Sequence, residues 1–253
     1  MKDVQNQEDH RNIYIDQVGI KDLILPVEIK MKDGSFGVTK AKISIAADLS
    51  PDKKGTHMSR FVDIIQNHRR IDIRNVRMVL EEIKEKLSAE NSYIDMEFDY
   101  FIEKAAPVTG IKSFLDVGIK YSAWIKDGDF EFQMTVNTPV TTLCPCSKEI
   151  SDYSAHNQRA NVAVTIRTSE FIWIEDIVRI SEEAASSPVY SVLKRPDEKY
   201  VTEYAYNNPR FVEDVARDVE LSIGSLGSIK SHTVEVESYE SIHNHSAYAK
   251  IVR

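Results

Sequence analysis

The chain has 253 residues, 42% of them hydrophobic and 28% charged, as in ordinary globular proteins that form one large domain or two smaller modules. Its formal net charge of -8 argues against a general nucleic-acid or membrane-surface binder, because such proteins carry excess positive charge. The polar start shows no secretory signal and no apolar run reaches membrane-spanning length, so we expect a cytoplasmic protein with reduced thiols.

The first half of the chain predicts strands and a helix. Residues 38–47 alternate, which places Ala41, Ile43 and Ile45 on one face of a half-buried strand. Residues 92–102 and 114–125 alternate in the same way. Between the segments 38–47 and 92–102, residues 76–87 carry an apolar helical stripe formed by Val76, Val79, Leu80, Ile83 and Leu87.

The second half predicts a similar order of elements. Strands are expected at 130–136, 161–166, 232–238 and 246–252, and a helix is expected at 174–185. A second helix is expected within 207–223, with Asn208 as its cap, Pro209 in its first turn and an apolar stripe of Phe211, Val215 and Val219. Each half therefore has the pattern of two strands, two helices and two strands. This is an α+β pattern of antiparallel sheets covered by helices on one side, with edges that need a partner.

Both cysteines lie in the segment 141–159, TTLCPCSKEISDYSAHNQR, which also contains His156. A disulfide between Cys144 and Cys146 is disfavoured, because their side chains diverge if the segment is extended. Metal ligation or nucleophilic catalysis remains, and a cysteine with a histidine supplies two of the three protein ligands of a catalytic metal. The plainer alternative is two small buried cysteines and a surface histidine.

Three other segments contain candidate site residues. In 193–203, LKRPDEKYVTE, a turn-like setting holds Asp197, Glu198 and Glu203, which could equally be a solvated charged loop. In 238–251, His243 and His245 would face the same side of a strand, with Glu240 just before them, as an acid–base set or as surface residues. In 53–61, KKGTHMSRF, the start of a helix carries three side chains that suit phosphate: His57, Ser59 and Arg60. Helix starts of this kind are common.

Four segments together resemble the type IB GTP cyclohydrolases: KGTHMSRF, TTLCPCSKEISDYSAHNQR, LKRPDEKYVTEYAYNNPRFVEDVAR and ESIHNHSAYAKI. The resemblance covers nearly the whole chain except the first dozen residues. It implies a bimodular tunnelling fold (T-fold), with four-stranded antiparallel sheets and two helices in each of two tandem units, 13–126 and 127–253. It also implies homotetramers with sites at subunit interfaces. The implied reaction converts GTP to 7,8-dihydroneopterin triphosphate and formate, at the entry to tetrahydrofolate and, in many bacteria, queuosine synthesis.

The resemblance also assigns roles to residues. Cys144, His156 and Glu198 match the ligands of one divalent metal, which such a donor set leaves open as zinc, manganese or iron, with no organic cofactor. Glu240, His243 and His245 match the catalytic segment, and Glu213 matches a glutamate that accepts hydrogen bonds from the guanine edge. Without the resemblance, Glu213 would be a favourable helix first-turn charge. The triphosphate would meet cations and neighbouring side chains: Arg60, Lys148 and Arg159, with Lys53, Lys54, His57 and Ser59 as further candidates. Cys146 matches a family position without a role.

Alternatives of other classes stay open at this stage. A nitrile reductase of the same fold would use a cysteine nucleophile and NADPH, but no segment resembles its cofactor motif. A metal-free cysteine hydrolase would use Cys144 with a histidine. A non-enzymatic purine-binding module would leave the thiol and the clustered histidines unexplained. We expect no nucleic-acid or membrane partner.

Overall fold

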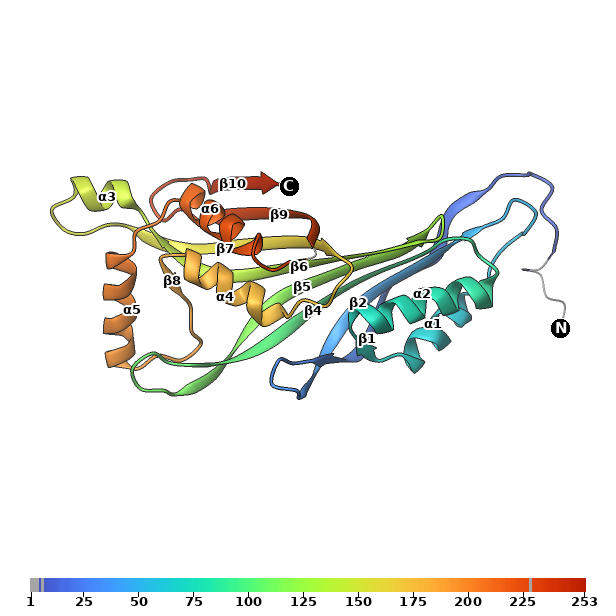
Figure 1. Cartoon of the computed structure of the whole chain (residues 1–253), viewed down its shortest axis with the longest axis horizontal. Coiled ribbons are helices and arrows are strands. Elements are labelled where there is room, and N and C mark those ends of the chain that lie inside the picture. Colours follow the sequence, from blue (N-terminus) through green and yellow to red (C-terminus); the bar gives the residue numbers. More distant parts are fainter. Residues whose placement is uncertain (1–4, 6, 228) are drawn as a thin grey trace. The chain divides into compact units, whose positions relative to one another are not determined.

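The computed structural model describes residue 5, residues 7–227 and residues 229–253 (Figure 1). They form two compact units. Unit 1 comprises the described residues up to Asp99, with Lys120–Gln133 and Thr168–Phe171, and unit 2 comprises Tyr100–Ile119, Met134–Arg167 and the described part of Ile172–Arg253. Segments of the two units alternate along the chain. The division of the chain into two tandem units at 126/127 stays a prediction. Within the described residues, we find no helix long and apolar enough to cross a membrane.

The first elements of the chain are β1 (Ile15–Lys30), β2 (Phe36–Leu49), α1 (Met58–Asn67), β3 (Arg70–Ile71) and α2 (Ile73–Leu87). Three long strands follow: β4 (Ser92–Ala105), β5 (Lys112–Lys126) and β6 (Asp129–Leu143). The remaining elements are α3 (Pro145–Ile150), β7 (Asn157–Thr168), α4 (Ile174–Ala184), β8 (Ser187–Pro188), α5 (Arg195–Asn207), α6 (Val212–Ile223), β9 (Ile229–Ser238) and β10 (Ala247–Val252).

The described strands form a ten-stranded sheet in the order β10-β9-β7-β6-β5-β4-β2-β1-β3, with β8 paired to β6. The β1–β2, β2–β4 and β9–β10 pairs are antiparallel, whereas β3 runs parallel to β1. The prediction of separate four-stranded sheets therefore differs from the structure. The reason is that β4, β5 and β6 are 14 or 15 residues long and each contributes residues to both units.

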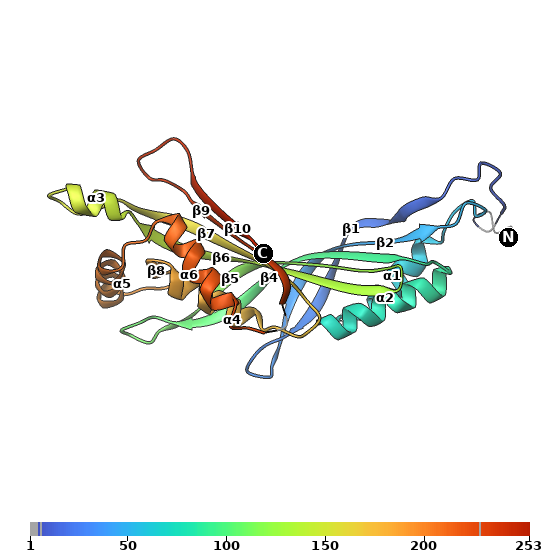
Figure 2. The same cartoon turned by 45° about the horizontal axis from the view of Figure 1, so that its top comes forward.

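The core of unit 1 confirms the alternation read from the sequence. Ala41, Ile43 and Ile45 of β2 are buried, and helices α1 and α2 lie on one face of β1 and β2 (Figures 1 and 2). Four of the five predicted stripe residues of α2 are buried with them: Val76, Val79, Leu80 and Ile83. The Asp72 carboxylate caps α2 by accepting from the backbone N–H groups of its first turn.

In unit 2, α4 and α6 pack together and α6 packs on β9 and β10 (Figure 2). Helix α6 begins at Val212, so the prediction that Asn208 caps it is wrong: Asn208 ends α5. Tertiary hydrogen bonds hold the connecting residues out of the helix, from Asn208 Nδ2 to the Ala185 carbonyl at 2.9 Å and from Arg210 N to the Leu143 carbonyl at 3.0 Å. Phe211 therefore precedes the helix and stays 39% exposed, while Val215 and Val219 are buried.

Two helices of unit 2 stand where the sequence predicted loop-like or turn-like backbone. Helix α3 begins directly after Cys144, so the segment with the two cysteines is not extended. Helix α5 contains the charged residues that were expected in a turn, and its first turn carries Asp197 and Glu198. Of the side chains in α5, only Asp197 and Ala205 are buried. The helix has no buried apolar face, which explains why no apolar stripe indicated it in the sequence.

Candidate functional site

The loop that carries the cysteines closes on itself within unit 2. Cys144 is the N-cap of α3, and its Sγ accepts from the Ser147 backbone N–H at 3.4 Å. The Cys144 N–H donates to the His156 carbonyl at 3.1 Å, and the His156 N–H donates to Ser147 Oγ at 3.2 Å. These bonds place the cysteine and the histidine opposite each other at the base of the loop. Cys146 lies in the first turn of α3 and is exposed.

The imidazole of His156 is held by a polar network. His156 Nδ1 lies 2.9 Å from Gln158 Oε1. The amide nitrogen of Gln158 in turn lies 3.2 Å from Thr142 Oγ1, 3.0 Å from Ser238 Oγ and 3.2 Å from Glu240 Oε1. Thr142 and Ser238 are buried, so the network rests on the ends of β6 and β9.

Glu240 stands beside His156 in this network. Its Oε2 lies 3.8 Å from His156 Nδ1, and its Oε1 accepts from Ser238 Oγ at 3.1 Å. The two side chains are 14% and 11% exposed, so both are largely buried yet reach the surface. The sequence had suggested Glu240 as the partner of His243 or His245, whereas the histidine beside it in the structure is His156.

His243 and His245 lie in the loop between β9 and β10, so the condition that they share a strand is not met. Their rings nevertheless stack, with centroids 5.2 Å apart and planes inclined by 18°. Both residues are exposed. The pair is therefore presented together at the surface of unit 2.

Glu198 and Glu213 are exposed in the first turns of α5 and α6, where a negative charge also favours the helix. The neighbour of Glu198, Asp197, is fully buried and accepts from the backbone N–H groups of Val108 (2.9 Å), Thr109 (2.8 Å) and Lys194 (2.9 Å). Burial opposes ionisation of this carboxyl, but the hydrogen bonds from Thr109 and the backbone hold the pKa of Asp197 well below its usual range. The start of α5, and with it Glu198, is thus fixed to the turn between β4 and β5.

The predicted phosphate contacts divide between the units. In unit 2, the Lys148 ammonium donates to the Tyr206 carbonyl at 2.6 Å and lies 4.2 Å from the centre of its ring, and Arg159 is exposed on β7. In unit 1, His57 is the N-cap residue of α1, Ser59 is exposed in that helix, and Arg60 donates to the Lys86 carbonyl at 2.9 Å. The side chains of Lys53 and Lys54 donate to the Ser88 carbonyl (3.5 Å) and to Gln7 Oε1 (3.1 Å).

The donors present fit a metal in part. Cys144 and His156 share the base of one loop, and the His156 ring is oriented through Nδ1, as is usual for a histidine that binds metal through its other nitrogen. Over the described part of the chain, however, no group of three His, Cys, Asp or Glu side chains is placed to hold an ion. The backbones of two of the three predicted ligands, Cys144 and His156, are thus bonded to each other, and among the described residues Glu198 does not complete a set with them.

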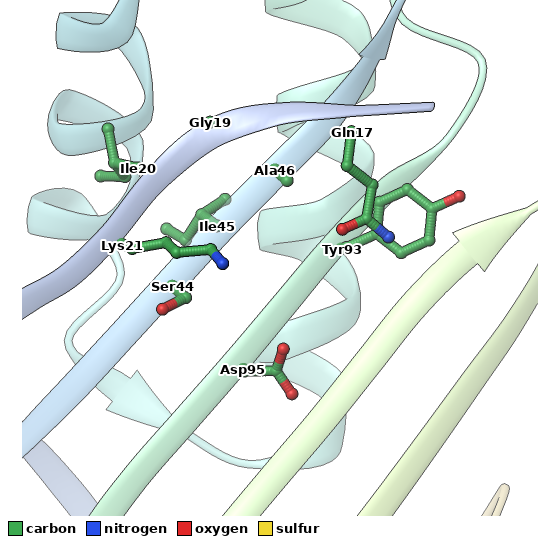
Figure 3. Close-up of a pocket in the computed structure, with 9 residues that line it drawn as sticks. All are labelled: Gln17, Gly19, Ile20, Lys21, Ser44, Ile45, Ala46, Tyr93 and Asp95. Atoms are coloured by element: carbon green, nitrogen blue, oxygen red, sulfur yellow. The ribbon is translucent and has the colours of Figure 1, made fainter. Parts of the chain in front are cut away.

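Unit 1 contains a cavity of about 280 Å³ over β1, β2 and β4, shown in Figure 3. Its lining includes Ser44 and Tyr93, which alternate with buried residues and therefore face away from the helices. Strand β1 lies so close to β2 here that a Cβ on Gly19 would come within 1.9 Å of the Ile45 carbonyl oxygen. None of the predicted site residues lines this cavity.

The sequence reading missed Gln158 and its two hydroxyl partners, Thr142 and Ser238. A signal was present in the spacing of the polar residues, although His156 and Glu240 lie just outside β7 and β9. Gln158 is two residues from His156, and Ser238 is two residues from Glu240. That the two pairs meet depends on the pairing of distant strands, which no local pattern reveals.

Comparison with known proteins addresses the fold first. Uricase from Arthrobacter globiformis superposes with a TM-score of 0.52 at 8% identity, covering 94% of each chain. A mutant urate oxidase from Bacillus sp. TB-90 superposes with a TM-score of 0.52 at 9% identity, covering 95% of this chain and 99% of that chain. At this level of identity the likeness concerns the fold alone, and it agrees with the predicted α+β class.

The sequence relatives are much closer. GTP cyclohydrolase FolE2 of Fervidobacterium nodosum is 48% identical over 98% of this chain and 96% of its own length. The FolE2 proteins of Nitrosomonas eutropha and Caldicellulosiruptor bescii are 49% and 51% identical, each over 99% of this chain and over 95% and 98% of their own lengths. A family model described as type I GTP cyclohydrolase folE2 matches residues 1–249. Since both the family model and these relatives span nearly all of its length, the chain belongs to the type I GTP cyclohydrolase FolE2 family.

Proposed function

We propose that the chain hydrolyses GTP as a GTP cyclohydrolase of the type IB class, in the first step of tetrahydrofolate biosynthesis. Water adds at C8 and opens the guanine imidazole ring, and a second hydrolysis releases C8 as formate. Rearrangement of the ribose and ring closure then give 7,8-dihydroneopterin triphosphate. The observation that carries the proposal is the closed loop that pairs Cys144 with His156, in a chain of the FolE2 family.

We propose that Cys144, His156 and Glu198 hold one divalent metal: zinc, manganese or iron. When bound, such an ion lowers the pKa of a coordinated water and so supplies hydroxide. Two features support this assignment: the shared loop base of Cys144 and His156, and the anchoring of α5 through Asp197. The Glu198 side chain is exposed, whereas the side chain of its neighbour Asp197 is buried.

The remaining roles belong to residues of both units. The exposed carboxylate of Glu213 can accept both N1–H and the 2-amino group of guanine. His243 or His245 would protonate N7 to make C8 more electrophilic, with Glu240 as a further catalytic residue. Lys148 and Arg159 of unit 2, with Arg60, His57 and Ser59 of unit 1, are the proposed triphosphate contacts.

Assembly into a cytoplasmic homotetramer of tandem T-fold units, with sites at subunit interfaces, is part of the same proposal. The sheet ends at β10 on one side and at β1 with the short β3 on the other. Tyr248 and Val252 of β10 are 57% and 59% exposed. Such edges present unpaired backbone groups that usually need a partner.

Incubation of the metal-replete protein with GTP tests the proposal. We expect release of formate and a product that becomes a fluorescent pterin on oxidation. GTP that stays intact under these conditions would overturn it. Light scattering tests the assembly separately, because a stable and fully active monomer would contradict the tetramer.

A further inference from the structure

We infer that Gln158 is a positioning residue that fixes His156 in the tautomer with its proton on Nδ1 and its lone pair on Nε2. The inference rests on the proposed function in one respect, namely that Nε2 of His156 is the atom that binds metal. It depends otherwise on hydrogen-bond chemistry within unit 2. Each step follows from whether an atom can donate, accept or do both.

The first step is the orientation of the Gln158 amide. Hydroxyl groups such as Thr142 and Ser238 can donate or accept, so they do not distinguish the amide nitrogen from the oxygen. A carboxylate only accepts. Because Glu240 Oε1 lies 3.2 Å from one end of the amide, that end must be the NH₂ group. The other end, which faces His156, is therefore the carbonyl oxygen.

The second step is the tautomer of His156. Gln158 Oε1 only accepts, and it lies 2.9 Å from His156 Nδ1, so Nδ1 must carry the hydrogen. A neutral imidazole has a single N–H, which leaves the lone pair on Nε2. Glu240 Oε2 is 3.8 Å from the same Nδ1, beyond hydrogen-bond distance. The amide, not the carboxylate, is thus the direct acceptor.

The consequence concerns metal binding. A ring with its hydrogen on Nε2 must first lose or move that proton before Nε2 can bind an ion. The contacts from Glu240 through Gln158 to His156 already place the hydrogen on Nδ1. Nε2 therefore carries a lone pair and can bind an ion without first losing a proton. Partners of this kind typically change metal affinity by about 10- to 100-fold when they are removed.

Nuclear magnetic resonance of the metal-free chain labelled with ¹⁵N-histidine tests the tautomer directly. The spectrum is recorded at a pH of about 8, above the ordinary histidine pKa of about 6.5. The His156 signals are identified by their loss in His156→Ala. We expect nitrogen shifts and couplings of a ring protonated on Nδ1. A ring protonated on Nε2 would overturn the inference, and this measurement needs no Gln158 variant that folds.

Replacement of Gln158 tests the positioning. Gln158→Met keeps the side-chain length but removes both amide groups, and Zn²⁺ affinity is measured by competition with a chromophoric chelator. We expect affinity to fall by about 10- to 100-fold and the Nδ1–H tautomer to lose its dominance. Asn161→Leu is the matched control, because Asn161 lies on the same strand and its amide bonds to Asn137. Equal affinity in Gln158→Met and Asn161→Leu would overturn the role of Gln158.

Glu240→Gln tests the step that orients the amide. Since a glutamine can donate as well as accept, the Gln158 amide would no longer be held in one orientation, and we expect both His156 tautomers to be populated. An unchanged tautomer would overturn this step.

The inference and the proposed function can fail separately. If the wild-type chain leaves GTP intact but shows the Nδ1–H tautomer and the loss of Zn²⁺ affinity in Gln158→Met, the proposed function fails and the inference stands. If the wild-type chain forms the pterin while His156 is protonated on Nε2, the inference alone fails.

Discussion

The two units each contain a cluster of buried polar contacts, but the clusters end on different groups. In unit 1, Asp48 accepts from the backbone N–H groups of Glu90 (2.9 Å) and Asn91 (2.8 Å) and from the Tyr14 hydroxyl (2.5 Å). In unit 2, the cluster around Gln158 ends on the His156 ring and the Glu240 carboxylate. The first arrangement closes a loop against a strand end, whereas the second orients groups that can bind a metal or move protons.

The comparison distinguishes polar contacts that stabilise the fold from polar contacts that orient reactive groups. Both clusters satisfy buried groups, so burial and hydrogen bonding alone do not mark a site. What distinguishes unit 2 is that its cluster contains the His156 ring and the Glu240 carboxylate, and that the backbone of this histidine is bonded to that of Cys144. Substitutions in the Gln158 cluster should therefore change chemistry, and those in the Asp48 cluster should change stability.

Outside the proposed metal ligands, the largest effect should come from Glu213. If its carboxylate pairs with the guanine edge, Glu213→Gln should lower kcat/KM for GTP by roughly ten- to a hundredfold, through loss of a hydrogen bond to a charged group. Bound metal should be unchanged. Glu85→Gln neutralises an exposed carboxylate on α2 of unit 1 and serves as the control. Identical kinetics for the two variants would leave Glu213 as a helix first-turn charge only.

Unit 2 also contains a buried polar contact outside the Gln158 cluster, at Asp197, whose loss should lower stability. Asp197→Ala would leave the backbone N–H groups of Val108, Thr109 and Lys194 without their acceptor. We expect a melting temperature lower by roughly 5–10 °C. Differential scanning calorimetry measures this against Asp152→Ala, which removes a carboxylate from the exposed loop after α3. Equal melting temperatures would mean that the anchoring of α5 contributes nothing to stability.

Tyr14 gives a smaller effect in unit 1, with a defined pH dependence. The hydrogen bond to Asp48, together with burial, raises the pKa of Tyr14 to about 12, against an unfolded value of about 10. The folded protein therefore holds the phenol proton more tightly, and this stabilisation is complete below a pH of about 10 and is lost as the pH rises toward about 12.

Tyr14→Phe should lower the free energy of unfolding by about 1 kcal/mol at neutral pH, near the low end for such a bond because Tyr14 is 41% exposed. The difference from the wild type should vanish as the pH approaches about 12. Urea titrations from neutral to alkaline pH measure both quantities. GTP turnover should stay at the wild-type value, and a large loss of turnover would break the distinction between the two clusters.

The smallest effect is expected at Cys146. It is exposed on α3 and lies outside the contacts that join Cys144 to His156. Cys146→Ala should retain measurable activity with GTP. Complete inactivity of a folded Cys146→Ala protein would show that the second thiol takes part in the chemistry.

The sequence predicted those parts of the fold that depend on local periodicity. The buried faces of β2, β4 and β5 and the stripe of α2 follow from alternation at two residues or at the helical period, and the structure confirms them. Helix α5 was missed because it buries only Asp197 and Ala205, and the start of α6 was misplaced because Arg210 bonds to the Leu143 carbonyl. Neither cause is local in the sequence.

The candidate site divides in the same way. Residue type and spacing sufficed to nominate Cys144 and His156, since thiols and imidazoles are rare in this chain. The role of Gln158 depends on Thr142 near the end of β6 and on Ser238 and Glu240 at and just after the end of β9. A pattern along the chain cannot show that these side chains meet.

Metal stoichiometry of the purified variants tests the central claim, that Cys144 and His156 form one half of a metal site in unit 2. Cys144→Ala and His156→Ala should lose both bound metal and activity with GTP, whereas Cys146→Ala should retain the wild-type metal content. Activity alone does not decide, because a cysteine nucleophile would also make Cys144→Ala inactive. If Cys144→Ala and His156→Ala both retain full metal, the ligand assignment is wrong and Cys144 acts on the substrate directly.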